Sequence, residues 1–157
     1  MAATPPAAPQ GIQPAFKRVQ QSDDFDCWAA CIATITGTSL DDVRKTAVEK
    51  FKLPAHGPYW VTEELIAKLF AHYGFVATVY KEVSKITDIA DVAICLVEYD
   101  ESTELGRHVV FVRDKRNPKQ TLEYLIDPAY WIDASQHVRT DFKTLAPAWC
   151  IGVHLMK

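Results

Sequence analysis

The sequence predicts an α+β fold, in which a group of helices is followed by a mostly antiparallel sheet. Three segments before Gly74 repeat apolar residues at helical spacing. After Gly74 the pattern changes to short runs of β-branched and aromatic residues, which are typical of strands. Because the helices come first and do not alternate with the strands, a parallel sheet built from βαβ units is not expected.

The composition is that of a globular domain. The chain has 157 residues, of which 48% are hydrophobic and 24% are charged. A chain of this length buries roughly two thirds of its unfolded surface, enough for a core without disulfides. The net charge of −3 offers no basic surface for nucleic acid. No apolar run approaches the roughly 18 to 20 residues of a membrane helix. We expect neither a nucleic-acid partner nor an integral membrane segment, and the oligomeric state stays open.

Residues 1–15 are rich in alanine and proline and carry no charged side chain. Such a segment has little to pack and resists regular structure, so we predict a disordered tail followed by one domain over residues 16–157. The tail lacks the positive start and apolar core of a secretory signal. Four scattered cysteines show no disulfide or metal spacing. The expected location is cytoplasmic, or outside the cell after export without a signal peptide.

The three predicted helices begin and end at recognisable residues. Asp26 can cap the first helix, which ends at Gly37. Ser39, with an acid three residues later, starts the second helix in a capping-box-like pattern. Thr62 caps the third helix, and Gly74 ends it. Local signals of this kind predict that all three helices form.

Five strands and two short helical turns are predicted in the C-terminal half. The predicted strands span residues 75–80, 92–99, 108–113, 122–126 and 150–155. The helical turns are expected at residues 84–91 and 141–145. The sequence contains no internal repeat, which agrees with one domain.

Cys27 stands where a polar loop turns into the first helix, and it is our candidate nucleophile. The unpaired amides and the dipole of a helix N-terminus favour a thiolate. With a histidine nearby, we expect the pKa of Cys27 to fall well below its free value of about 8.5. The backbone amide of Cys27 and the side-chain amide of Gln21 could supply two oxyanion donors. Gln20 is the rival donor.

A predicted hairpin would supply the base and the group that orients it. If its turn centres on residues 117–118, His108 faces Asp127 across the two strands. Directly opposed residues place their Cβ atoms about 4.5 to 5.5 Å apart, close enough for an aspartate to hold an imidazole in one tautomer. His56, in a loop, and His72, in the third helix, are the alternative bases.

Together these residues resemble the papain-like cysteine peptidases, and more closely their compact branch related to the bacteriocin leader-processing peptidases that cut after double glycine. The resemblance covers about residues 16–130 and rests on Gln21, the segment around Cys27, His108, and Asp127 followed by proline. It implies that the helix bearing Cys27 packs against a sheet bearing His108 and Asp127. It also implies hydrolysis of a peptide or protein amide through an acyl-enzyme, without a cofactor. The leader-processing peptidases usually have glycine where this chain has Trp28.

Other interpretations of the same residues stay open. Cys27 could be a small buried helix residue, since free cysteine is often buried. A zinc site made by Cys27, Cys31 and a histidine would lack paired-ligand spacing. A catalytically silent domain of the same fold could bind a peptide or a partner protein. A deamidase or transferase would share the acyl-enzyme step with a peptidase.

Aromatic residues are the candidates for substrate binding. Trp28 directly follows the candidate nucleophile, while Tyr59 and Trp60 lie in a loop broken by prolines and a glycine. Trp131 is a further candidate near the end of the hairpin. Aromatic rings in loops also cover the edges of a core, so these residues have a structural alternative.

Overall fold

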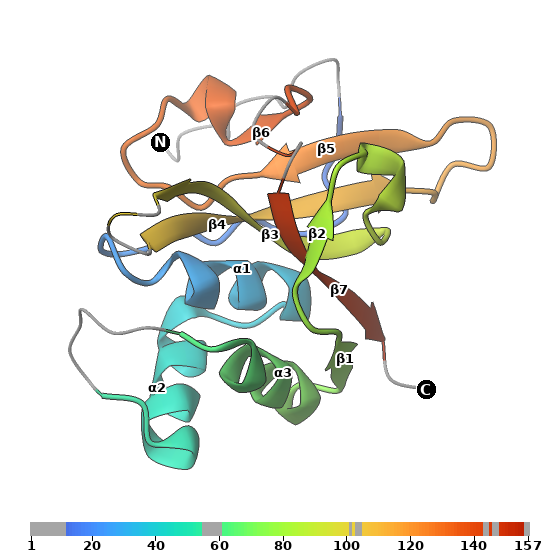
Figure 1. Ribbon diagram of the computed structural model, residues 1–157. Helices are drawn as coiled ribbons and strands as arrows, with labels where there is room; N and C mark the ends of the chain where they lie inside the picture. Colours follow the sequence, from blue (N-terminus) through green and yellow to red (C-terminus); the bar gives the residue numbers. More distant parts are fainter. Residues whose placement is uncertain are drawn as a thin grey trace, which may run out of the picture.

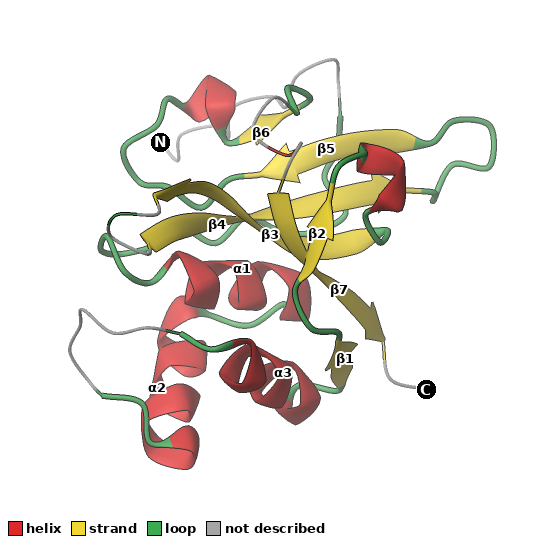
Figure 2. Cartoon of the chain, viewed as in Figure 1, coloured by secondary structure: helices red, strands yellow, loops and turns green. Residues whose placement is uncertain are grey.

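The computed structural model describes residues 12–54, 61–100, 102, 105–142, 145 and 148–155. Three helices pack beside a twisted sheet, as the red and yellow elements of Figure 2 show. The helices are α1 (Cys27–Thr36), α2 (Leu40–Phe51) and α3 (Glu63–His72), with short 3₁₀ turns η2 (Ile86–Asp88) and η3 (Ala134–Gln136). The strands are β1 (Phe75–Ala77), β2 (Lys81–Val83), β3 (Val92–Asp100), β4 (Leu105–Asp114), β5 (Leu122–Ile126), β6 (Val138–Arg139) and β7 (Ala148–Leu155). The predicted α+β fold class is confirmed.

The sheet is antiparallel at every pairing within the described residues. Its strand order is β1-β7-β3-β4-β5-β6, and β2 also pairs with β7. The last strand of the chain therefore lies inside the sheet, next to β3 (Figure 1). The segment predicted as one strand over residues 75–80 is divided. It contains β1, and β2 begins only after Tyr80, which lies in the irregular link between the two strands.

Two of the three predicted helix caps are formed. Ser39 and Thr62 each accept a hydrogen bond from the backbone amide three residues later, at 3.1 Å. Asp26 occupies the N-cap position of α1, but its side chain caps no helix amide. Its carboxylate instead accepts hydrogen bonds from the amides of Ser22 and Asp23 in the preceding loop. The predicted role of Asp26 as a helix cap is therefore wrong, because this buried carboxylate shapes the loop that leads into α1.

The helix α1 is the centre of the main core. Its residues from Cys27 to Ile35 are all buried, and it packs against α2, α3 and β4. A helix that is apolar on all sides is stable only when other elements surround it. The fold therefore holds Cys27, the first residue of α1, against the sheet.

In the described part of the chain, no helix is both long enough and apolar enough to span a bilayer.

The packed domain begins earlier than residue 16. Ile12 is 5% exposed and belongs to the main core. The amide of Ala15 donates a hydrogen bond to the hydroxyl of Tyr124 at 2.8 Å. The predicted tail boundary at residue 15 is therefore wrong at its C-terminal end, because one isoleucine among small residues produces no periodic signal. Residues 1–11 of the predicted tail lie outside the described residues.

Candidate active site

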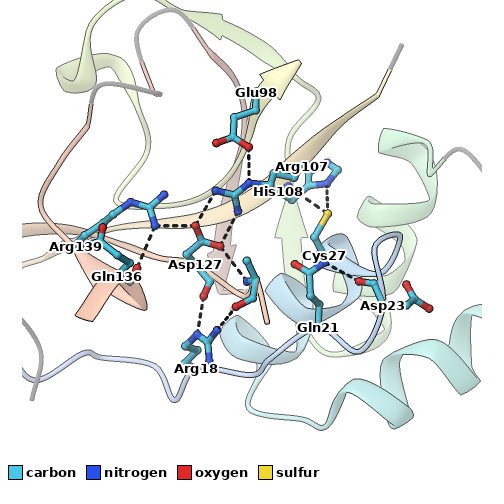
Figure 3. A network of polar contacts seen from close by, with 11 residues as sticks. Arg18, Gln21, Asp23, Cys27, Glu98, Arg107, His108, Asp127, Gln136 and Arg139 are labelled. Atoms are coloured by element: carbon cyan, nitrogen blue, oxygen red, sulfur yellow. Dashed lines mark hydrogen bonds and ion pairs between the residues drawn. The ribbon is translucent and has the colours of Figure 1, made fainter. Parts of the chain in front are cut away.

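Cys27 and His108 meet between α1 and the sheet. The Sγ atom of Cys27 lies 3.4 Å from Nδ1 of His108, and the backbone amide of His108 donates to the same sulfur at 3.3 Å (Figure 3). Cys27 is the first residue of α1, and His108 lies in β4. The structure thus brings together the thiol and the imidazole that the sequence predicts as nucleophile and base.

Strand alternation explains why His108 faces the helices. Successive side chains of a strand point to opposite faces of the sheet. Val110 and Val112 belong to the core cluster that contains α1, whereas Val109 and Phe111 belong to a second cluster. His108 shares the face of Val110 and Val112, which is the face that α1 covers.

Asp127 does not reach His108. The pairing of β4 with β5 places Val110 opposite Ile126, which is one residue away from the predicted register. A shift of one residue moves a side chain to the other face of a sheet, so Asp127 lies on the face of Leu125 and the second core cluster. The predicted contact between Asp127 and His108, and with it the Cys-His-Asp triad, is therefore wrong.

The carboxylate of Asp127 is instead the centre of an ion-pair network, shown in Figure 3. Arg107 donates two hydrogen bonds to it, at 2.7 and 2.9 Å, and Arg139 donates a third at 2.7 Å. Arg18 binds the backbone oxygens of Asp127 and Ala129 at 2.6 and 2.7 Å. These contacts join the N-terminal segment to the end of β5.

Tyr80 takes the position beside His108 that was expected for Asp127. Its hydroxyl lies 2.7 Å from Nε2 of His108, the ring nitrogen that does not face Cys27. The two rings are stacked, with centroids 6.4 Å apart and planes inclined by 27°. The backbone amide of Tyr80 donates to Glu63 at 2.8 Å. Tyr80 is not predictable from the sequence, because no local pattern marks a contact made between the β1–β2 link and β4.

Burial decides the protonation of the Cys27–His108 pair. Their side chains are nearly closed off, with exposed fractions of 5% for Cys27 and 8% for His108. Burial raises the pKa of Cys27 to about 11, outweighing the backbone hydrogen bonds to its sulfur, which lower it. Burial also lowers the pKa of His108 to about 4. The resting pair is a neutral thiol and a neutral imidazole, so the predicted thiolate with a lowered pKa is wrong for this closed site.

Gln21 is held in the loop before α1. Its backbone amide donates to the oxygen of Pro128 at 2.9 Å, and its side-chain Nε2 donates to the oxygen of Asp23 at 2.8 Å. Nε2 carries a second hydrogen, because a primary amide has two, and no contact among the described residues uses it. Its Oε1 atom is buried and has no hydrogen-bond partner within the described residues. The rival donor Gln20 is exposed and accepts a hydrogen bond from Arg18.

The other predicted residues lie elsewhere or are not described. Trp28 is 2% exposed and packs in the main core, so its predicted role in substrate binding is wrong. Tyr59, Trp60 and His56 lie outside the described residues. His72 is exposed at the end of α3, where its Nδ1 contacts the amine of Lys50 at 2.9 Å.

A pocket of about 650 Å³ lies beside Tyr80. Its described lining consists of Glu63, Tyr80, Leu96, Tyr99 and Trp149. Since Tyr80 also binds His108, a ligand in this pocket would lie next to the Cys27–His108 pair. Among the described residues, no group of three or more His, Cys, Asp or Glu side chains is placed to hold a metal ion.

Comparison with known proteins gives a relationship at the level of the fold. No family model and no curated protein match this sequence. Nine chains of solved structures match its structure, among them the crystal structure of a double glycine motif protease from an AMS/PCAT transporter in complex with the leader peptide. That match has a TM-score of 0.59 and 16% sequence identity, and it covers 90% of this chain and 92% of the other. The chain therefore shares the fold of a double glycine motif protease, as the sequence predicts.

Proposed function

We propose that this protein is a cysteine peptidase that cleaves a peptide or protein through an acyl-enzyme on Cys27. The observation that carries the proposal is the 3.4 Å contact between Cys27 Sγ, at the start of a buried helix, and Nδ1 of His108. Nucleophile and base within hydrogen-bonding reach are the mark of an activated thiol. The fold match to a protease bound to a leader peptide supports a peptide as the substrate.

The neutral pair sets the tautomer of His108. When the Cys27 thiol donates to Nδ1, the imidazole carries its hydrogen on Nε2 and donates it to the hydroxyl oxygen of Tyr80. As Sγ bonds to the scissile carbonyl carbon, its proton passes to Nδ1. Tyr80 is then the positioning residue that keeps the imidazole aimed at the sulfur, in the place where a triad has a carboxylate.

The remaining steps use groups around the sulfur. The backbone amide of Cys27 and the second hydrogen of Gln21 Nε2 are the proposed donors to the oxyanion. The imidazolium of His108 gives its proton from Nδ1 to the leaving amine, which departs as the acyl-enzyme forms. Water then attacks the thioester while His108 accepts its proton, and Cys27 is released as the thiol. This route needs no metal or cofactor.

A comparison of wild type with Cys27→Ala tests the proposal. Both proteins are incubated with a proteome-derived peptide mixture, and mass spectrometry records new termini as well as glutamines that gain about 1 Da. We expect new termini with wild type only. Cys31→Ala, one turn later on α1 and also buried, is the matched control and should retain cleavage.

The outcome separates three possibilities. Cleavage that survives Cys27→Ala would contradict the proposal. If glutamines gain about 1 Da and no new termini appear, the protein is a deamidase that works through the same acyl-enzyme on Cys27. Absence of any product from wild type, with an intact fold by circular dichroism, would favour a domain that only binds its partner.

A further inference from the structure

The pocket beside Tyr80 is lined mainly by aromatic side chains. Three of its five described lining residues are aromatic (Tyr80, Tyr99 and Trp149), one is aliphatic (Leu96), and one is a carboxylate (Glu63). Tyr99 and Trp149 are 48% and 45% exposed, although large aromatic side chains usually bury most of their surface. We call this site the aromatic pocket. Exposed rings around a concavity next to an active site are available to a ligand.

Sheet register connects the aromatic pocket to the reacting atoms. Leu96 of β3 lies directly opposite His108 on β4 and directly opposite Trp149 on β7. Opposed residues share a face, so His108, Leu96 and Trp149 form one row on the helix-covered face. Strands are about 4.8 Å apart, which places Trp149 roughly 10 Å from His108. An extended peptide covers that distance in about three residues.

The one charged residue in the described lining of the aromatic pocket is Glu63, which is acidic. Glu63 uses Oε2 to accept the Tyr80 amide, which leaves Oε1 available. Glu82 of β2 lies opposite Trp149 and continues the same row. No lysine, arginine or histidine is among the described lining residues. The faces of tyrosine and tryptophan rings carry negative potential and attract cations, especially beside a carboxylate.

We propose that the aromatic pocket binds a lysine or arginine side chain of the peptide substrate, two to four residues from the bond that is cleaved. This inference rests on the proposed function only in taking the ligand to be a substrate. The methylene stem of the side chain lies on Leu96 and Trp149, the charged end faces Tyr99, and Glu63 accepts its hydrogen bond.

A purely apolar side chain is the weaker candidate for the pocket. It would cover the carboxylate of Glu63 and leave Oε1 without water or a partner, which carries a desolvation cost. An acidic side chain would add repulsion from both Glu63 and Glu82. A basic side chain removes the desolvation cost and uses the aromatic faces as well, so the pocket discriminates by charge as well as by size.

The experiment uses a positional-scanning library of acetylated octapeptides in which one position at a time is fixed. Binding to immobilised Cys27→Ala protein is read by mass spectrometry, and cleavage by wild type is followed in parallel. We expect enrichment of lysine or arginine at one position by about tenfold over norleucine and glutamine. Glu63→Gln should remove most of that enrichment, because it keeps the acceptor for the Tyr80 amide and loses only the charge.

Two variants serve as controls for the charge and for the rings. Glu64→Gln removes the same charge from the neighbouring residue of α3, whose side chain pairs with Lys68 and does not line the pocket, so the preference should stay. Trp149→Leu keeps an apolar wall and removes the ring, and it should reduce the preference by about threefold or more.

Each outcome supports or overturns the pocket proposal, the peptidase proposal or both. Cleavage without a preference for a basic residue overturns this inference and leaves the peptidase proposal standing. A preference for leucine or phenylalanine that Glu63→Gln does not change also overturns it. Basic-peptide binding that depends on Glu63, with no cleavage by wild type, supports the pocket and contradicts the peptidase. If the protein neither binds nor cleaves any peptide of the library, both proposals are overturned.

Discussion

The two faces of β4 carry polar clusters of opposite character. On the helix-covered face, His108 lies between Cys27 and Tyr80, and all three groups are neutral at rest because burial favours their uncharged forms. On the other face, the adjacent residue Arg107 binds the buried carboxylate of Asp127 with two hydrogen bonds. Neighbours in the sequence therefore take part in different chemistry.

The difference between the two clusters shows what gives one buried polar group a structural role and leaves another able to react. A buried charge is tolerated when opposite charges and hydrogen bonds satisfy it, and such a network holds its geometry. A buried nucleophile and base that stay neutral leave room for a proton to move between them. The carboxylate of Asp127 has no capacity left to orient His108, because Arg107, Arg139 and the amide of Ala129 occupy both of its oxygens.

The largest expected effect belongs to Asp127→Asn. This change removes the ion-pair partner of Arg139 and leaves Arg107 with only the exposed carboxylate of Glu98, which should lower the free energy of unfolding by about 3 to 5 kcal/mol. Urea denaturation measures the loss. Under conditions where the variant is folded, its turnover should stay within about threefold of wild type. A fall in kcat by two orders of magnitude at unchanged stability would return Asp127 to the active site.

The second effect is a pH dependence that comes from His108. Its pKa is about 4 in the folded protein against an ordinary 6.5, so the unfolded chain binds more protons between these values. The stabilising contribution is complete above pH 6.5 and is lost as the pH falls toward 4. Its size is roughly 3 kcal/mol, at about 1.4 kcal/mol for each pH unit.

The matched comparison for this pH effect is His108→Gln. The free energy of unfolding of both proteins is measured by urea denaturation between pH 4 and 7. Wild type should lose roughly 3 kcal/mol more than the variant over this range. The remaining slope includes His137, whose pKa burial also lowers. Equal slopes in the two proteins would show that folding does not lower the pKa of His108, because the folded and the unfolded chain would then take up the same proton over this range.

The smallest expected effect is that of Tyr80→Phe, which tests whether Tyr80 positions His108 on the helix-covered face. The ring stays in place, but Nε2 of His108 loses its 2.7 Å partner. We expect kcat to fall about tenfold with little change in KM, and stability to fall by about 1 to 2 kcal/mol. The acid limb of the pH profile of kcat/KM should move, because the partner of the imidazole has changed.

Tyr73→Phe is the control for the loss of a hydrogen-bonded tyrosine hydroxyl. Its hydroxyl binds Asp42 and Thr46 near the end of α3, away from His108. This variant should change stability without moving the pH profile. If Tyr80→Phe behaves in the same way as the control, Tyr80 has only a structural role and His108 needs no positioning residue.

Much of the fold was predictable because its signals are local. Ser39 and Thr62 mark helix starts through side chains that reach an amide three residues later, so a few adjacent residues contain the information. The same holds for Cys27 at the start of α1 and for His108 in a strand. Asp26 shows the limit of such signals, because the same residue type caps a helix or shapes a loop according to where its carboxylate is buried.

The sequence by itself determined the helix-then-strand order, the nucleophile at a helix N-terminus and the histidine on a strand. Only the tertiary structure decided which groups surround them. A register one residue from the predicted one moves Asp127 to the opposite face, and Tyr80 reaches Nε2 of His108 from a segment with no sequence signal. The protonation of the pair was likewise decided by packing, because desolvation depends on every element that covers a group rather than on its neighbours in the chain.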